Sequence, residues 1–388
     1  MDFHNKNILI ILHTGVLGGA ERQGLGISKI LTEEYNCKVF LLLTFSGTMT
    51  DDFEEFTRHC HILQNLHFGS PYLLIKKELS LKNIKRSVWS IKYLLRLRKN
   101  LIDYKFDIVV PFLNFPSKIA FYLYKLLPTV KFTFWHQLGL DNFSYDVLEH
   151  YAAKSVPCVI SNASNGIDLY LEGYKVKLSK LNVLPQYISL DVEHKDESVL
   201  RKKFHIDDDA IVIGMIAHFR DEKYHEFVLN SFYELSKRYN NIVLVFLGQK
   251  NVNKVTLTKF NFLKNKIDKL RLTDRVKLLT DQNVHDVLNI IDVGVLISRI
   301  EGMPNVVMEY MLYGLPVVAT NHPGCIQLLE DSEFLIENEE LNLINSLDEL
   351  IGSTEKRTSE GNRNLKRIAK FDMKSYMSQL ENIMNKYA

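Results

Sequence analysis

Cysteine is scarce in this chain of 388 residues, which contains only four copies. No Cys-x-x-Cys pair is present, and Cys37, Cys158 and Cys325 lie inside or beside apolar runs. This usage excludes a disulfide framework, and we expect reduced, mostly buried thiols. The segment 59–61, His-Cys-His, offers metal-ligating side chains, but no further ligand cluster accompanies it. A surface turn is the better interpretation, and the sequence predicts no metal site.

Long apolar runs and a strong net charge are also missing. No segment approaches the 18 apolar residues that a membrane-spanning helix needs, and the first apolar run, 8–12, is shorter than the core of a signal peptide. We therefore expect a cytoplasmic protein that can still touch a membrane surface. The 48 Lys and Arg against 46 Asp and Glu leave a net charge of +2, which argues against nucleic acid as the main partner.

The chain does have an ordinary globular composition, 46% apolar and 24% charged, over a length that suits two domains. Short β-branched and Leu-rich runs alternate with stretches of helical periodicity, which predicts an α/β fold with parallel, doubly wound sheets. The runs expected to be strands are 8–12, 38–43, 61–63, 107–111, 130–135, 156–161, 181–184, 211–217, 242–247, 276–279, 293–297, 316–320 and 334–336.

A domain boundary is expected in the stretch 185–196, which is short, polar and poorly periodic. We assign 1–187 to an N-terminal domain, 188–365 to a second domain, and 366–388 to a C-terminal helix that crosses back to the first. Ligands of doubly wound sheets bind beyond the carboxyl ends of the strands. Two such domains that face each other would form a cleft, and any active site would lie there.

The most informative segment is 301–320, which reads Glu-Gly-Met-Pro-Asn-Val-Val-Met-Glu and continues to Gly-Leu-Pro-Val-Val-Ala-Thr. It follows a predicted strand, and its prolines and Gly314 predict a helix over about 304–313. The start of such a helix presents unpaired backbone N–H groups and a positive dipole end, which suit a phosphate. Glu301 and Glu309 bracket this helix end. Carboxylates there are poor phosphate ligands but good acceptors for sugar hydroxyls.

The frame E-G-x-P-N-x-x-x-E-x-x-x-x-G-x-P-V-V-A-T closely resembles the signature of family 4 glycosyltransferases. These are retaining, nucleotide-sugar-dependent enzymes of GT-B architecture, in which two Rossmann-like domains face each other across a cleft. The segment 15–22, Gly-Val-Leu-Gly-Gly-Ala-Glu-Arg, is similar to the glycine-rich first loop of the family. The resemblance covers nearly the whole chain and is strongest in the C-terminal half.

The resemblance implies a role for each residue of the frame. Glu301 would contact hydroxyls of the donor sugar and Glu309 the nucleotide ribose, while the N–H groups near Asn305 and Val306 would contact the diphosphate. Three glycines are assigned to donor binding as well. These are Gly18 and Gly19, whose missing side chains permit close approach of a ligand, and Gly248 after the strand 242–247.

The segment 214–223, Gly-Met-Ile-Ala-His-Phe-Arg-Asp-Glu-Lys, supplies the second donor element. The family usually has an Arg directly after the strand and a Lys five positions later, both directed at the diphosphate. Lys223 matches the Lys, but His218 stands where the Arg is expected, and Arg220 follows two residues later. A cation here would stabilise charge on the leaving diphosphate. Whether Arg220 or His218 fills the phosphate-binding role stays open.

His136 ends a predicted strand of the first domain, and by resemblance it lies beside the donor sugar as a catalytic residue. The glycine-rich loop could alternatively be a dinucleotide fingerprint. However, no G-x-G-x-x-G is present, and the second strand ends without the acidic residue that would hold a ribose.

The resemblance implies transfer of a sugar from a nucleotide-diphosphate donor to a hydroxyl of a glycan or lipid-linked acceptor, with retention, in surface polysaccharide biosynthesis. UDP is favoured by its frequency in the family. No cofactor or metal is expected. Two alternatives stay open: a nucleotide-sugar epimerase of similar architecture, and a catalytically silent glycan-binding subunit.

The segment 82–102 predicts a basic amphipathic helix. At 100° per residue, its apolar residues form one arc and its cations the other, with two aromatic residues among the cations. Such a pattern favours an anionic membrane surface, so we expect a peripheral location at the cytoplasmic face of the membrane. A solvated helix is the alternative. The residues expected to contact membrane or acceptor are Lys85, Arg86, Trp89, Lys92, Tyr93 and Arg96.

Overall fold

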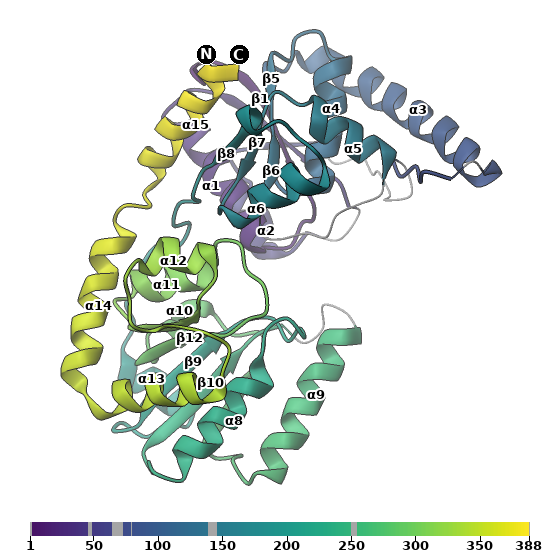
Figure 1. Cartoon of the computed structure of the whole chain (residues 1–388). Coiled ribbons are helices and arrows are strands. Elements are labelled where there is room, and N and C mark those ends of the chain that lie inside the picture. The colour runs from purple at the N-terminus through teal and green to yellow at the C-terminus, as the bar shows by residue number, and fades with distance from the viewer. Residues whose placement is uncertain are drawn as a thin grey trace. The chain divides into compact units, whose positions relative to one another are not determined.

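The computed structural model describes residues 2–45, 49–63, 73–78, 80–138, 146–249 and 254–387 (Figure 1). The chain divides into two compact units. The N-terminal unit comprises Met1–Ser189 and Met373–Ala388, and the C-terminal unit comprises Leu190–Asp372. The predicted boundaries differ slightly, since they lie at 187/188 for the first domain and at 366 for the start of the last segment. Ala388 lies outside the described residues.

The N-terminal unit is built on a five-stranded parallel sheet in the order β3-β2-β1-β4-β5. Ile8 to Leu12 of the first strand are fully buried, as expected for a parallel strand with helices on both faces. The strands are β1 Asn7–Leu12, β2 Lys38–Leu43, β3 His61–Ile62, β4 Ile108–Pro111 and β5 Phe132–Thr133. The helices are α1 Gly19–Glu33, α2 Asp51–Phe56, α3 Leu81–Leu101, α4 Asn114–Leu126, α5 Val147–Ser155, α6 Asn165–Asp168 and α15 Met373–Tyr387.

A second, three-stranded parallel sheet completes this unit, in the order β6 Trp135–Gln137, β7 Val159–Ser161 and β8 Leu181–Val183. The sequence predicted one strand over 130–135, and this prediction was wrong. Phe132 pairs with Ile108 in the large sheet, whereas Trp135 pairs with Val159 in the small one. A continuous apolar run does not reveal such a change of partner, because both halves are buried.

The C-terminal unit holds a six-stranded parallel sheet in the order β11-β10-β9-β12-β13-β14. Its strands are β9 Ile211–Ile216, β10 Ile242–Leu247, β11 Val276–Leu279, β12 Val293–Leu296, β13 Val317–Thr320 and β14 Leu335–Ile336. Its helices are α7 Glu197–Lys203, α8 His225–Ser236, α9 Lys254–Lys269, α10 Val284–Leu288, α11 Asn305–Leu312, α12 Pro323–Leu329, α13 Glu340–Gly352 and α14 Thr354–Ile368. The predicted strands match these positions closely.

The chain ends in two helices, α14 and α15, that belong to different units. The C-terminal helix expected over 366–388 corresponds to α15, because α14 continues to Ile368. α15 buries Tyr376, Met377, Leu380 and Met384 in the core of the N-terminal unit. α14 stays on the C-terminal unit, where Gly361 lies so close to the Gly314 carbonyl that a Cβ atom would sit 2.0 Å from its oxygen.

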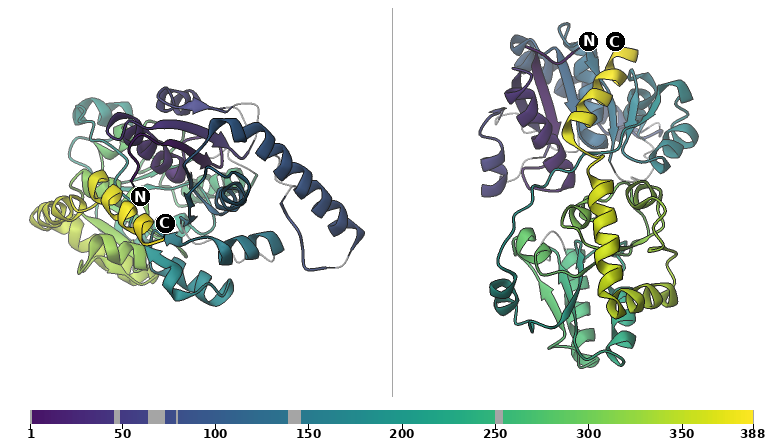
Figure 2. Two further views of the ribbon diagram at one scale, coloured as in Figure 1. Left: turned by 90° about the horizontal axis from the view of Figure 1, so that it is seen from above. Right: turned by 90° about the vertical axis from the view of Figure 1, so that its left-hand side faces the viewer.

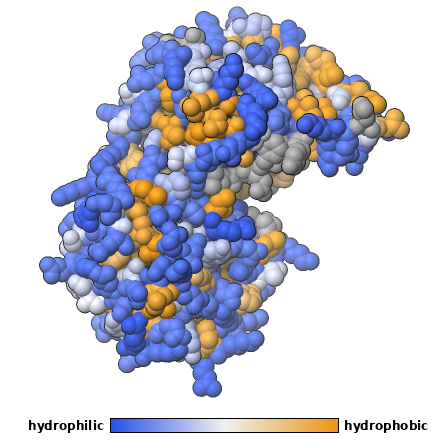
Figure 3. Space-filling model, in the orientation of Figure 1, coloured by the Kyte–Doolittle hydropathy of each residue, from blue (hydrophilic) through white to orange (hydrophobic). Residues whose placement is uncertain are grey.

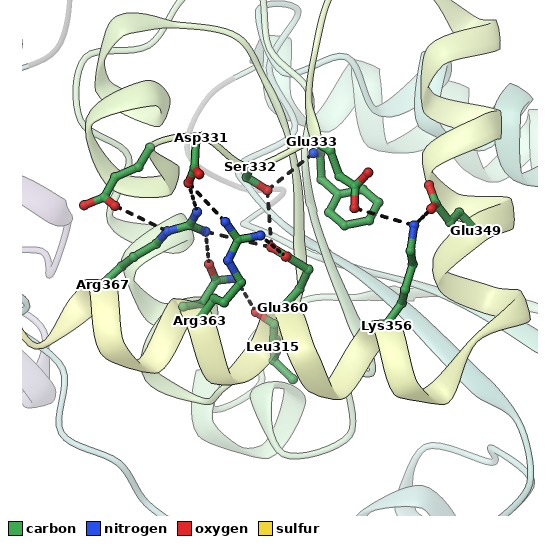
Figure 4. Close-up of polar contacts among 12 residues, drawn as sticks. Leu315, Asp331, Ser332, Glu333, Glu349, Lys356, Glu360, Arg363 and Arg367 are labelled. Atoms are coloured by element: carbon green, nitrogen blue, oxygen red, sulfur yellow. Dashed lines mark hydrogen bonds and ion pairs between the residues drawn. The ribbon is translucent and has the colours of Figure 1, made fainter.

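An ion-pair network fastens α14 to the loop between α12 and β14 (Figure 4). Arg367, only 5% exposed, donates to Asp331 at 2.7 Å. Arg363 donates to Glu360 at 2.6 Å and to Asp331 at 3.1 Å. The shared carboxylates join the helix to the sheet edge, so the network has a structural role in this unit.

The face of α3 that packs on the N-terminal unit differs from the expected one. Tyr93, predicted at a membrane surface, is 7% exposed and belongs to the core, whereas Trp89 is 49% exposed. The buried face carries two polar residues that bond to the preceding segment: the Asn83 amide donates to the Lys76 carbonyl, and the Ser90 hydroxyl accepts from the Leu73 N–H. Polar residues can be buried when they form hydrogen bonds, so a hydropathy pattern alone does not identify the face of the helix that packs on the unit.

Candidate active site

Two loops at the carboxyl ends of β9 and β12 meet in the C-terminal unit. The Tyr224 N–H donates to the Ile297 carbonyl at 3.1 Å, and the Arg299 N–H donates to the Glu222 carbonyl at 2.8 Å. Lys223 and Ser298 thus form an antiparallel bridge between the two loops, although the strands β9 and β12 that precede these loops are parallel. The bridge fixes both loops where a doubly wound sheet binds its ligands.

The bridge brings together the two strongest candidates of the sequence analysis, Lys223 and Glu301, which are 78 positions apart. Their side chains form an ion pair, and they are 22% and 11% exposed, respectively. A largely buried pair gains more from mutual attraction than a surface pair, and each charge fixes the orientation of the other. The arrangement places an ammonium beside a carboxylate at the edge of the sheet.

The loop that carries Glu301 is held tightly from behind. The Ser298 N–H donates to the Thr320 hydroxyl at 3.1 Å, and the Ser298 carbonyl accepts from the Asn338 amide at 2.9 Å. Gly324 lies so close that a Cβ atom there would be 1.7 Å from the Gly302 carbonyl oxygen. Only glycine permits this approach, so the frame needs Gly324 for packing.

Helix α11 begins directly after this loop, with Pro304 as its N-cap and no side-chain cap. No acidic residue occupies its first turn, so the positive dipole end near Asn305 and Val306 is not neutralised by a carboxylate on the helix itself. The Tyr310 hydroxyl accepts from the Ile216 N–H at 2.8 Å and donates to the Gly214 carbonyl at 3.0 Å, which locks the helix against β9.

Glu309 lies on the next turn of α11 and is 6% exposed. It and Glu301 therefore lie on the helix and on the loop before it, as the frame predicted. Gly248 lies at the end of β10, where a Cβ atom would be 2.2 Å from the Ala217 carbonyl oxygen. A side chain at position 248 would therefore collide with the backbone at the end of the adjacent strand β9. The role of Gly248 in donor binding stays a prediction.

His218 and Arg220 lie on the β9 loop with Lys223. Burial lowers the pKa of His218, and the nearby cations Arg220 and Lys223 lower it further. At neutral pH His218 is therefore neutral. Arg220 is 46% exposed and lies 3.8 Å from Glu222. The side chain with a permanent charge is thus the more accessible of the two.

Sequence reasoning missed His225, which is fully buried at the start of α8. Its Nδ1 lies 2.6 Å from the Lys223 carbonyl, and its Nε2 lies 3.3 Å from the Ala217 carbonyl. The imidazole therefore spans the β9 loop and holds the backbone of Lys223. Burial lowers its pKa to about 4. A histidine two residues after Lys223 was the only signal in the sequence.

His225→Asn is expected to flatten the pH dependence of stability. Between pH 6.5 and pH 4 the unfolded chain binds a proton at this residue and the native chain does not, so the free energy of unfolding falls as pH falls, by up to about 1.4 kcal/mol per pH unit. Urea unfolding at pH 7.5, 6.5, 5.5 and 4.5 measures this slope. The exposed His194 of the same unit provides the control, and His194→Asn should keep the wild-type slope. An unchanged slope in His225→Asn would contradict the assignment.

The N-terminal unit contains the other predicted residues. Gly18 caps α1, and Gly19 is its first residue. A Cβ atom on Gly18 would be 2.7 Å from the Glu21 carboxylate. Glu21 is 6% exposed and accepts from the Thr14 hydroxyl at 3.2 Å, so it holds the loop in shape. Burial raises the pKa of this carboxyl.

His136 lies in β6 and is 2% exposed. Its ring Nδ1 lies 3.1 Å from the Pro111 carbonyl, and its backbone N–H donates to the Ser117 hydroxyl at 2.9 Å. Burial lowers its pKa to about 4, and the Pro111 contact opposes the shift only in part. His136 is therefore neutral at physiological pH, and its catalytic role stays a prediction.

The part of the chain that the structure describes contains no group of three or more His, Cys, Asp or Glu residues suited to a metal ion. Its helices include none long and apolar enough to cross a bilayer.

Comparison with known proteins indicates the class of protein. Residues 196–367 match the family Glycosyl transferases group 1. The chain is 24% identical over 307 residues, 72% of its length, to an uncharacterized glycosyltransferase of Methanocaldococcus jannaschii, and it covers 74% of that protein. It is 26% identical over 201 residues to the capsular polysaccharide biosynthesis glycosyltransferase CapM of Staphylococcus aureus, which is half of each chain.

Among solved structures, Anabaena HepE in complex with UDP and glucose superposes with a TM-score of 0.77 at 16% identity, over 98% of this chain and all of HepE. The fold is therefore α/β with the GT-B architecture of glycosyltransferases. The protein is a glycosyltransferase, and its match to the family Glycosyl transferases group 1 covers residues 196–367, less than half of the chain.

Proposed function

We propose that this glycosyltransferase moves a sugar from a nucleoside-diphosphate donor, with UDP favoured, to a hydroxyl of a glycan or lipid-linked acceptor, with retention at the anomeric carbon. The observation that carries the proposal is the ion pair of Lys223 and Glu301 beside the start of α11. It sets a cation and a helix N-terminus, which suit a diphosphate, beside a carboxylate, which suits sugar hydroxyls.

Each group has a role in the proposed reaction. The bond between the anomeric carbon and the leaving phosphate oxygen breaks, and a bond from the acceptor oxygen to the same carbon forms. Negative charge grows on the leaving diphosphate, where Lys223 and the N–H groups near Asn305 and Val306 stabilise it. Arg220 or His218 adds a further contact. The leaving phosphate accepts the proton of the acceptor hydroxyl, so no separate base is required. Lys223 and the start of α11 supply the positive charge that a metal ion would otherwise contribute.

The relatives support the choice of donor and pathway. HepE is solved with UDP, with UDP-glucose, and with UDP and glucose, and it shares the fold. CapM acts in capsular polysaccharide biosynthesis. We accordingly propose a UDP-sugar and a role in surface polysaccharide biosynthesis at the cytoplasmic face of a membrane.

Product analysis separates this proposal from its two alternatives. The protein is incubated with single UDP- or GDP-sugars and an extract of membrane lipids and glycans, and the products are analysed by mass spectrometry. Release of nucleoside diphosphate with one sugar added to an acceptor supports the transferase. An isomerised donor would indicate an epimerase, and a donor that stays intact would indicate a silent glycan-binding subunit.

Glu309→Gln is expected to weaken UDP binding roughly 10- to 100-fold, because a carboxylate that accepts ribose hydroxyls contributes about 1.5 to 3 kcal/mol. Calorimetric titration with UDP measures the change. The control is Glu339→Gln, which alters an exposed glutamate of the same unit and should leave the Kd unchanged. Equal affinity of Glu309→Gln and wild type would remove Glu309 from the donor site.

A further inference from the structure

Helix α3 of the N-terminal unit exposes a row of large apolar side chains. Ile84, Val88, Ile91 and Leu95 are 60%, 46%, 59% and 56% exposed. Their spacing of four, three and four residues places them on one face of the helix. Figures 1 and 2 show α3 reaching outward from this unit, and Figure 3 shows apolar surface beside hydrophilic surface there. We call these four residues the apolar stripe.

The helix does not need this stripe for its own packing. The opposite face contacts the unit, through the buried Tyr93, Leu97 and Leu101 in one apolar core and through Asn83 and Ser90 by hydrogen bonds. Exposed aliphatic residues are common one at a time, but a contiguous row on one helix marks a surface that meets a partner.

The charge on α3 indicates the kind of partner. The helix contains seven cations, Lys82, Lys85, Arg86, Lys92, Arg96, Arg98 and Lys99, and no Asp or Glu. Within the described parts of the chain, no carboxylate forms an ion pair with any of them. At 100° per residue, Lys85, Lys92 and Arg96 run along one border of the apolar stripe. The helix therefore offers an apolar row bordered by uncompensated positive charge.

We infer that the apolar stripe inserts into an anionic lipid surface while the bordering cations bind its headgroups. The inference rests on the proposed membrane location and specifies which surface of the protein contacts the membrane. A second copy of this chain is a poor occupant, because it would bring seven further cations against seven. Anionic headgroups supply the missing counter-charge, and the acyl boundary accepts the aliphatic side chains. Trp89, beyond the cation row, lies at headgroup depth.

Flotation with vesicles tests the surface. The full-length protein is mixed with vesicles of 70% phosphatidylcholine and 30% phosphatidylglycerol, or of phosphatidylcholine alone, and the bound fraction is measured. Wild type should bind the anionic vesicles at least tenfold more strongly than the neutral ones. The stripe variant should bind the anionic vesicles at least tenfold more weakly than wild type. It combines Ile84→Ser, Val88→Ser, Ile91→Ser and Leu95→Ser. A second variant removes three cations and should bind the anionic vesicles about 100-fold more weakly, at roughly fivefold per cation. It combines Lys85→Gln, Lys92→Gln and Arg96→Gln.

The matched control changes four exposed aliphatic residues of the C-terminal unit to serine: Val199, Val255, Leu257 and Leu341. This variant should bind vesicles within twofold of wild type. The inference would be overturned if the stripe variant bound vesicles as strongly as wild type, or if wild type bound neutral and anionic vesicles equally. It would also be overturned if wild type formed a dimer and the stripe variant lost that dimer but kept its vesicle binding. UDP titration of the same variants keeps the questions separate, since donor binding should be unchanged in all of them.

Discussion

Lys223→Ala is expected to lower the rate of sugar transfer roughly 100- to 1,000-fold, while the fold is retained. In our proposal the Lys223 ammonium contacts the leaving diphosphate and stabilises its negative charge. Loss of one such group from a preorganised site has an effect of this size on kcat. Steady-state kinetics of nucleoside diphosphate release measures the change. Lys237→Ala serves as the control. This exposed lysine directly follows α8, and its side chain contacts Glu234 and the ring of Tyr233. The rate of this variant should match wild type.

The ion pair makes a second outcome specific. Because Lys223 and Glu301 orient each other, removing both should cost little more than removing the more harmful one alone. The variant that combines Lys223→Ala with Glu301→Gln tests this non-additivity. Effects that multiply fully, or a Lys223→Ala enzyme with wild-type kcat, would mean that the pair does not act as a unit in catalysis.

Lys118→Met is expected to destabilise the N-terminal unit by about 3 to 5 kcal/mol. Lys118 of α4 is 3% exposed, and its ammonium lies 2.5 Å from Asp146 and 3.4 Å from Glu149 on or beside α5. It also donates to the Leu73 carbonyl at 3.0 Å. Removing the cation leaves two buried carboxylates without their counter-charge, which is far more costly than losing a surface pair.

Urea unfolding followed by circular dichroism measures this loss. Lys177→Met, at an exposed lysine of the same unit, should change stability by no more than about 0.5 kcal/mol. Adding Asp146→Asn and Glu149→Gln to Lys118→Met should recover part of the stability, because no buried charge is then left alone. A Lys118→Met protein as stable as wild type would show that the cluster carries no net stabilisation.

Much of the candidate active site could be predicted from sequence, because its residues lie in short segments. The frame around Glu301 and Glu309 specifies a strand, a loop and a helix in order, and the structure has them as β12, the loop and α11. The contact between Lys223 and Glu301 could not be predicted from the sequence. It depends on an antiparallel bridge between two distant loops, and no local pattern encodes such a bridge.

The face of α3 was predicted wrongly for a related reason. Periodicity separates apolar and basic arcs, but it does not say which arc another segment covers. Here the segment 73–78 bonds to Asn83 and Ser90, and this selects the face that contains Tyr93. The role of His225 was not predicted, because its ring holds the backbone carbonyl of Lys223 and a contact with the main chain leaves no pattern in the sequence.

A crystal structure of the protein with UDP tests the central claim most directly. We expect the diphosphate within hydrogen-bonding distance of the Lys223 ammonium and of the N–H groups near Asn305 and Val306, and the ribose hydroxyls on Glu309. The same structure would show whether Arg220 or His218 contacts the phosphates. UDP bound away from α11, or no bound UDP at millimolar concentration, would contradict the account.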